Sequence, residues 1–182
     1  PASLGENMIQ SILEDRSGVM WFGTQSNGLD RYDRATGRFT HFRHDPSNPR
    51  SISDNMIYSL LEDRRGVLWI GTYQGGLNRF DRATGTFTAY QHNDTLPGSL
   101  GAKGIWALHE DRDGVLWVGT YKGGLDRFDR ETETFTHFKH DPLNQSTLSN
   151  DAVVCFHEDR TGTLWVGTMN GLNRFDKRTG TF

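Results

Sequence analysis

The sequence repeats four times, and the spacing of the repeat limits what the chain can fold into. Trp21, Trp69, Trp117 and Trp165 are each 48 residues apart. The first lies in the string EDRSGVMWFGT at 14–24, which is followed from Gly28 by GLDRYDRATGRFTHF, and both strings recur around the other three tryptophans. The fourth copy has one residue fewer between Thr168 and Gly171. Four copies in register identify a repeat protein.

Each copy contains four short runs of largely alternating apolar residues, separated by turns that carry glycine. In the first copy the runs cover 8–13, 19–24, 28–32 and 38–42. The turns at 15–18 and 33–37 each begin with aspartate and end with glycine, which supplies the left-handed position of a hairpin turn. The intervals leave no room for a helix of ordinary length. An aromatic content of 12% and 21 glycines also suit short strands.

These features predict an all-β fold, a β-propeller made of four four-stranded blades of 48 residues. We expect a single repeat domain over 1–182, with blades at about 3–50, 51–98, 99–146 and 147–182. The last blade should lack most of its outer strand. A β-solenoid is the structural alternative, but its coils are usually shorter and lack hairpin turns at this spacing.

The four strands of a copy can be called A to D, from the inside of the propeller outward. The A–B and C–D hairpins then share one rim, and the B–C loops share the other rim with the connections between blades. An unpaired outer edge invites pairing with another chain. The chain is therefore either part of a longer propeller or a unit that forms a homo-oligomer, such as a dimer, through its open blade edges.

The string G-x-L-W-x-G-T, followed by G-L-x-R-F-D and then T-x-x-F, resembles the two-component regulator propeller repeat, four times over the whole chain. The resemblance implies a place among the seven-bladed propellers that form the extracytoplasmic sensor region of hybrid histidine kinases. It implies a periplasmic or extracellular module that responds to polysaccharide breakdown products. The kinase that would carry the signal output is not in this sequence.

Residues that recur identically are predicted to be structural. The four tryptophans occupy the same position in strand B of every copy, which favours packing between blades over stacking on a sugar. The pair Arg31 and Asp33 also recurs in each copy, which favours ion pairs within a blade or turn caps over a catalytic or metal-binding set.

The histidines and the one cysteine give no prediction of a metal site or a cofactor. Five histidines fall in strand D or just after it, where solvated side chains are favoured over metal ligands: His41, His44, His92, His137 and His140. His109 and His157 replace Leu13 and Leu61 on the innermost strand, and we expect hydrogen-bonded core histidines there. Cys155 lies in an apolar run and is predicted to be a buried, structural thiol.

A ligand site should lie where the copies differ, and three sets of positions differ on the B–C rim. The B–C loops contribute Gln25, Asn27, Tyr73, Gln74, Tyr121, Lys122, Met169 and Asn170. The entrances to strand A hold Asn7, Asn55, Lys103 and Asp151, and a position early in strand A holds Gln10, Tyr58, Trp106 and Val154. Amide and charged groups beside aromatic faces suit a small polar ligand with apolar faces, such as an oligosaccharide. The alternative is that these loops have simply drifted in sequence.

The function predicted from these observations is non-catalytic ligand recognition in an extracytoplasmic sensor. A structural or protein-binding scaffold is the alternative, and an enzyme with scattered rim residues is a third. The sequence contains no G-x-S-x-G, H-E-x-x-H, P-loop or C-x-x-C motif. A net charge of −3 with both signs interspersed gives no electrostatic reason to expect nucleic acid or a membrane surface as a partner.

Overall fold

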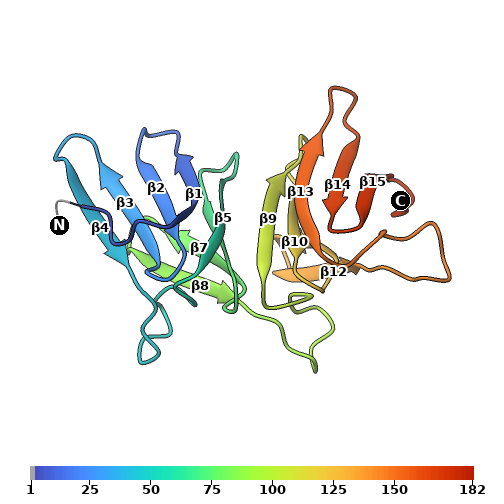
Figure 1. Ribbon diagram of the computed structural model, residues 1–182, viewed down its shortest axis with the longest axis horizontal. Helices are drawn as coiled ribbons and strands as arrows, with labels where there is room; N and C mark the ends of the chain where they lie inside the picture. Colours follow the sequence, from blue (N-terminus) through green and yellow to red (C-terminus); the bar gives the residue numbers. More distant parts are fainter. Residues whose placement is uncertain (1–2) are drawn as a thin grey trace. The chain divides into compact units, whose positions relative to one another are not determined.

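A computed structural model describes residues 3–182, which form antiparallel sheets and no helix (Figure 1). Each of the first three repeats folds into one four-stranded sheet in which the strands lie in sequence order. The first sheet contains β1 (Ile9–Glu14), β2 (Met20–Thr24), β3 (Leu29–Asp33) and β4 (Arg38–Phe42). The second contains β5 (Ile57–Glu62), β6 (Leu68–Thr72), β7 (Leu77–Asp81) and β8 (Thr86–Tyr90). The third contains β9 (Ile105–Glu110), β10 (Leu116–Thr120), β11 (Leu125–Asp129) and β12 (Thr134–Phe138).

The fourth sheet has three strands, β13 (Val153–Glu158), β14 (Leu164–Thr168) and β15 (Gly171–Phe175). Beyond β15, the described residues add one isolated bridge between Asp176 and Thr181. The predicted all-β propeller blades, including the incomplete last blade, are therefore confirmed. The strands of the first repeat begin and end within one residue of the predicted runs.

Contacts within the chain divide it into two compact units, one reaching to Tyr90 and the other running from Gln91 to Phe182. The first unit holds the first and second blades, and the second unit holds the third and fourth. The assignment of the whole chain to one domain stays a prediction.

Aromatic side chains fill the interface between the two blades of each unit. In the first unit, Trp21 is 1% exposed, and its ring meets that of Phe80 in the next blade edge-on at 5.2 Å. In the second unit, Trp117 meets Phe175 in the same way at 5.1 Å. Burial of a side chain of this size stabilises the fold by about 3 kcal/mol. Trp69 is also buried, and its ring lies 6.0 Å from that of Tyr90; Trp165 is half-buried.

Glycine in strand B lets neighbouring blades approach closely. A Cβ added to Gly23 would lie 2.6 Å from Cγ2 of Ile57, and one added to Gly119 would lie 2.7 Å from Cγ1 of Val153. Both isoleucine and valine start strand A of the following blade. Any larger residue in place of the glycine of the W-x-G-T string would push the two sheets apart.

The aspartate of each EDRxG turn organises both the turn and the tryptophan. Asp15 Oδ1 accepts hydrogen bonds from the Ser17 and Val19 N–H groups, both at 3.0 Å. Asp15 Oδ2 accepts one from the Trp21 indole N–H at 2.9 Å. The same indole bond is made to Asp63, Asp111 and Asp159 in the other blades.

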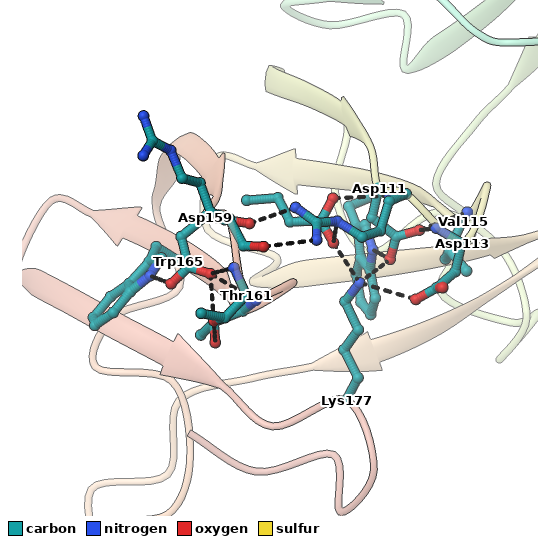
Figure 2. Close-up of polar contacts among 12 residues, drawn as sticks. Asp111, Asp113, Val115, Asp159, Thr161, Trp165 and Lys177 are labelled. Carbon is teal, nitrogen blue, oxygen red and sulfur yellow. Dashed lines mark hydrogen bonds and ion pairs between the residues drawn. The ribbon is translucent and has the colours of Figure 1, made fainter.

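A cation from the C–D hairpin connects two blades at this rim. In the first unit, Arg82 lies 2.7 Å from Asp15 in one blade and 3.0 Å from Glu62 in its own blade. In the second unit, Figure 2 shows Lys177 reaching Asp111 and Asp113, which it meets at 2.7 and 3.2 Å. Lys177 also lies 3.0 Å from Glu158. The recurring acidic residues are therefore structural.

Candidate functional site

The variable position in strand A faces the first residue of the B–C loop in its own blade. Gln10 Nε2 donates to Gln25 Oε1 at 3.0 Å in the first blade. The rings of Tyr58 and Tyr73 lie 5.7 Å apart in the second blade, at an angle of 63°. Two of the predicted sets of positions thus come together on one rim.

The third blade carries the most extensive aromatic pair. Trp106 and Tyr121 stack with ring centroids 4.5 Å apart and planes inclined by 23°. In the fourth blade the same positions are apolar and exposed, with Val154 37% and Met169 66% accessible. The chemical type of the two positions changes together: both are amides in the first blade, aromatic in the second and third, and apolar in the fourth. This is the sequence signal that would have revealed their contact.

A groove of about 360 Å³ lies on this rim within the second unit. Its lining is Tyr121, Lys122, His140, Asn150, Asp151, Ala152 and Met169. Four of these are predicted site residues. Sequence reasoning missed His140 and Asn150 as groove residues; both lie in or next to the connection between the third and fourth blades, whose folding back onto the rim is not encoded by a local pattern.

Lys122 has an unusual backbone conformation for its residue type. Its φ is 71°, in the left-handed region, which costs a residue with a Cβ about 1 kcal/mol. Its ammonium nitrogen lies 5.0 Å from the centroid of the Tyr121 ring. The loop therefore holds a cation beside the aromatic pair in a conformation that the lysine does not itself favour.

Several predicted site residues have structural partners instead. The Asn55 side-chain oxygen accepts the His44 N–H at 2.8 Å, and Asp151 Oδ1 accepts the His140 N–H at 2.7 Å. The Asn27 side chain donates to the Gly5 carbonyl. Asn7, Gln74, Lys103 and Asn170 are exposed.

The prediction that the outer histidines are solvated is wrong for His41, His92 and His137. Their Nδ1 atoms lie 2.7 Å from Asp30, 2.6 Å from the Leu100 carbonyl and 2.6 Å from Asp126, respectively. His44 and His140 are exposed, yet each also donates from Nδ1 to a carbonyl of the following connection. The reason is that the connections fold back along strand D.

Two predictions for the inner strand also need correction. Cys155 and His157 are exposed, because they alternate with Phe156, which packs toward the third blade. His109 stacks on Phe156 at 6.1 Å, but its buried Nε2 has no hydrogen-bond partner among residues 3–182. Burial lowers the pKa of His109.

The recurring Arg–Asp pair of strand C acts as a turn cap and a packing group. Asp33 Oδ1 accepts the Ala35 N–H at 2.8 Å, and the Arg31 guanidinium lies 5.9 Å from the Trp21 ring centroid. In the part of the chain that the structure describes, no cluster of His, Cys, Asp or Glu side chains is arranged to hold a metal ion.

The blades and their repeated strings define a protein of the β-propeller repeat class. Residues 3–26, 51–74, 99–122 and 147–170 match the two-component regulator propeller family. The chain belongs to this family. None of the curated proteins compared matches the chain.

Solved structures extend the comparison. The extracellular domain of a protein described as a hybrid two-component system of B. thetaiotaomicron is 30% identical with a TM-score of 0.84; the match covers 99% of this chain and 24% of that one. A second such domain from B. thetaiotaomicron is 29% identical with a TM-score of 0.75, covering 97% and 24%. The chain thus spans about a quarter of these domains. Virginiamycin B lyase from Staphylococcus aureus, at 18% identity and a TM-score of 0.70 over 98% of this chain and 55% of that one, shares the fold alone.

Proposed function

We propose that this chain is the ligand-recognition part of an extracytoplasmic sensor and binds a small polar ligand, such as an oligosaccharide, without chemical conversion. The observation that carries the proposal is the groove in which Tyr121, backed by Trp106, lies beside Lys122 and Asp151. The similarity to extracellular domains of two-component systems supports a place outside the cytoplasm. Residues 3–182 contain no helix long and apolar enough to cross a bilayer.

The groove offers a sugar both kinds of contact that it needs. The C–H face of a pyranose packs on an aromatic ring, and the stacked Trp106 keeps the Tyr121 ring in place. The Lys122 ammonium and the Asn150 amide can donate to hydroxyl or carboxylate groups, and the Asp151 carboxylate has lone pairs beyond the one that accepts the His140 N–H. Ala152 and Met169 supply the apolar remainder of the lining.

A glycan array followed by titration calorimetry tests the site. Tyr121→Ala and Lys122→Ala should each weaken the binding of any saccharide found by about tenfold or more, which corresponds to about 1.4 kcal/mol. Leu143→Ala is the control, since this leucine is 95% exposed on a connection and does not line the groove. Unchanged affinity in both rim variants would contradict the proposed site.

A second candidate function, a self-associating scaffold, is favoured by the edge of β15. Among residues 3–182, β14 is the one strand that pairs with β15. Leu172 of β15 is 68% exposed. It lines a groove of about 610 Å³ together with Asn173, Arg174 and Phe182. An edge strand with free backbone groups and apolar side chains can pair with the same edge of a second copy.

Light scattering of the 182-residue chain tests self-association. We expect a mass above that of one chain at high concentration and a return to one chain in Leu172→Lys, because an edge lysine opposes strand pairing. Leu143→Lys adds the same charge away from the edge and should not change the mass. A single-chain mass for the unaltered protein at all concentrations would refute this second candidate.

A further inference from the structure

The residue that follows the leucine of strand C is a buried carboxylate in two blades and a buried amide in the other two. Asp30 in β3 and Asp126 in β11 have fully buried side chains. The same position holds Asn78 in β7 and Asn173 in β15. An unpaired carboxylate would be costly to bury, so the two aspartates need compensating groups that the asparagines do not.

The groups around this position differ together: a glycine N–H accompanies each aspartate, and a serine accompanies each asparagine. Asp30 and Asp126 each accept a backbone N–H, from Gly5 and Gly101, at 2.6 Å. A Cβ on Gly101 would lie 2.7 Å from Asp126 Oδ1, so this position beside the carboxylate has no room for a side chain. In the second blade Ser53 takes the place of the glycine, and its Oγ accepts from the Asn78 amide at 2.7 Å. The fourth blade repeats this bond between Ser149 and Asn173.

His137 completes the set of the third blade, and both of its ring nitrogens lie close to an oxygen atom. Its Nδ1 lies 2.6 Å from Asp126 Oδ1, and its Nε2 lies 2.9 Å from the Pro97 carbonyl oxygen. The Pro97 carbonyl and an ionised Asp126 are both acceptors, and an imidazolium has an N–H for each of them. Burial raises the pKa of Asp126, so the proton between Asp126 and His137 belongs to the pair. The hydrogen bond to Asp126 raises the pKa of His137, against the opposing effects of partial burial and of Lys139, the other charge that faces it.

These groups hold the connection between the second and third blades against the rim loop. Pro97 and Gly101 both belong to this connection, and Phe135 N–H in β12 donates to the Gly98 carbonyl at 2.9 Å. A Cβ on Gly123 would lie 2.6 Å from the carbonyl carbon of Gly101, so the loop that carries Tyr121 and Lys122 packs directly on the connection.

We propose that Asp126, His137 and Gly101 form a proton-dependent latch that fixes this connection, and with it the loop at 121–124, so that the shape of the groove depends on pH. The part that concerns the groove rests on the proposed function, whereas the latch itself does not. Because the pKa of His137 is raised in the folded protein, the latch stabilises fully below the ordinary value of 6.5 and is lost as pH rises through the folded value.

The first blade supplies an internal control. His41 contacts Asp30 at 2.7 Å, but Arg43 also lies 3.0 Å from Asp30 and stays charged at every pH of interest. The Asp30 carboxylate therefore keeps a cationic partner over this whole range. The hydrogen bond from the Gly5 N–H to Asp30 should therefore persist at the pH at which the bond from the Gly101 N–H to Asp126 weakens.

Nuclear magnetic resonance of the full chain tests the latch between about pH 5.5 and about pH 8.5. His137 should titrate with a midpoint above 6.5. The protection of the Gly101 amide against hydrogen exchange, corrected for intrinsic base catalysis, should fall several-fold through that midpoint, while that of Gly5 changes less. A His137 midpoint at or below 6.5, or equal behaviour of the two glycines, would overturn the latch.

A variant carrying Gly101→Ser, Asp126→Asn and His137→Ala installs the set found at Ser53, Asn78 and Ala89 in the second blade. It should fold, and the pH-dependent change in protection at residue 101 should disappear. Persistence of that change in the folded variant would assign it to other groups and refute the latch. Neither readout uses a ligand, so failure to find a saccharide would count against the rim site alone.

Discussion

Replacing Trp21 with alanine should lower the free energy of unfolding by about 3–5 kcal/mol, the range for deleting a large buried aromatic side chain. The indole lies between two sheets, 5.2 Å from the Phe80 ring, so its loss opens a cavity at the blade interface. It also removes the N–H that binds Asp15 and the ring beneath the Arg82 guanidinium. Chemical denaturation followed by far-ultraviolet circular dichroism measures the change without depending on indole fluorescence.

Trp165→Ala is the matched control for this prediction. Trp165 occupies the same place in its repeat and donates to Asp159 at 2.9 Å, but it is only half-buried. Its loss should destabilise the protein by at least about 1 kcal/mol less, because less apolar surface returns to water. Equal losses in the two variants would show that packing between blades is not what the recurring tryptophan provides.

Replacing Asp111 with alanine should destabilise the second unit by about 3 kcal/mol or more, because several donors lose one buried charged acceptor. The Asp111 side chain is fully buried and accepts from the Trp117 indole at 2.9 Å and the Val115 N–H at 3.0 Å. It also lies 2.7 Å from Lys177 (Figure 2). Denaturant unfolding at neutral pH measures the loss.

Asp113→Ala separates this effect from a general loss of charge. The Asp113 side chain is 69% exposed and meets the same lysine at 3.2 Å, an arrangement worth less than about 1 kcal/mol. A similar loss in both variants would mean that the buried hydrogen bonds of Asp111 contribute little.

The contribution of Asp111 to the stability of the fold should depend on pH. Burial raises the pKa of Asp111, but hydrogen bonds from Lys177 and the Trp117 indole outweigh it and bring the pKa below its ordinary value of 3.8. The stabilisation is therefore present above pH 3.8 and is lost as pH falls through the folded value. In Asp111→Ala, this part of the acid sensitivity should be missing.

The strands were predictable from the sequence because their signals are local. An alternating run that ends in an Asp–Gly turn fixes a hairpin within about ten residues, whatever the rest of the chain does. The recurrence of Trp21 and its copies then indicated packing between blades. The role of Asp15 was only half predicted: its place in a turn is a local property, whereas its bond to the indole depends on how the hairpin closes.

The residues of the candidate groove were predictable as a set of positions but not as an arrangement. Variation among the copies selected Tyr121 and Lys122, which do line one groove. The stacking of Trp106 on Tyr121 follows from a register shift near the start of β9, which no local pattern reveals. The histidines were misjudged because their partners, such as the Pro97 carbonyl, lie on connections whose path is set by tertiary contacts.

The buried polar sets of strand C have a consequence for how such chains can gain or lose repeats. Gly101, Asp126 and His137 all belong to one repeat, so a recombination event that moves a whole repeat carries the carboxylate and its compensating groups together. A breakpoint between Gly101 and Asp126 would instead join a serine-type entrance to an aspartate and press the serine side chain against the carboxylate, since a Cβ at residue 101 would lie 2.7 Å from Asp126 Oδ1. Blade shuffling in the laboratory should therefore tolerate junctions in the connections ahead of these glycines far better than junctions within the sheets.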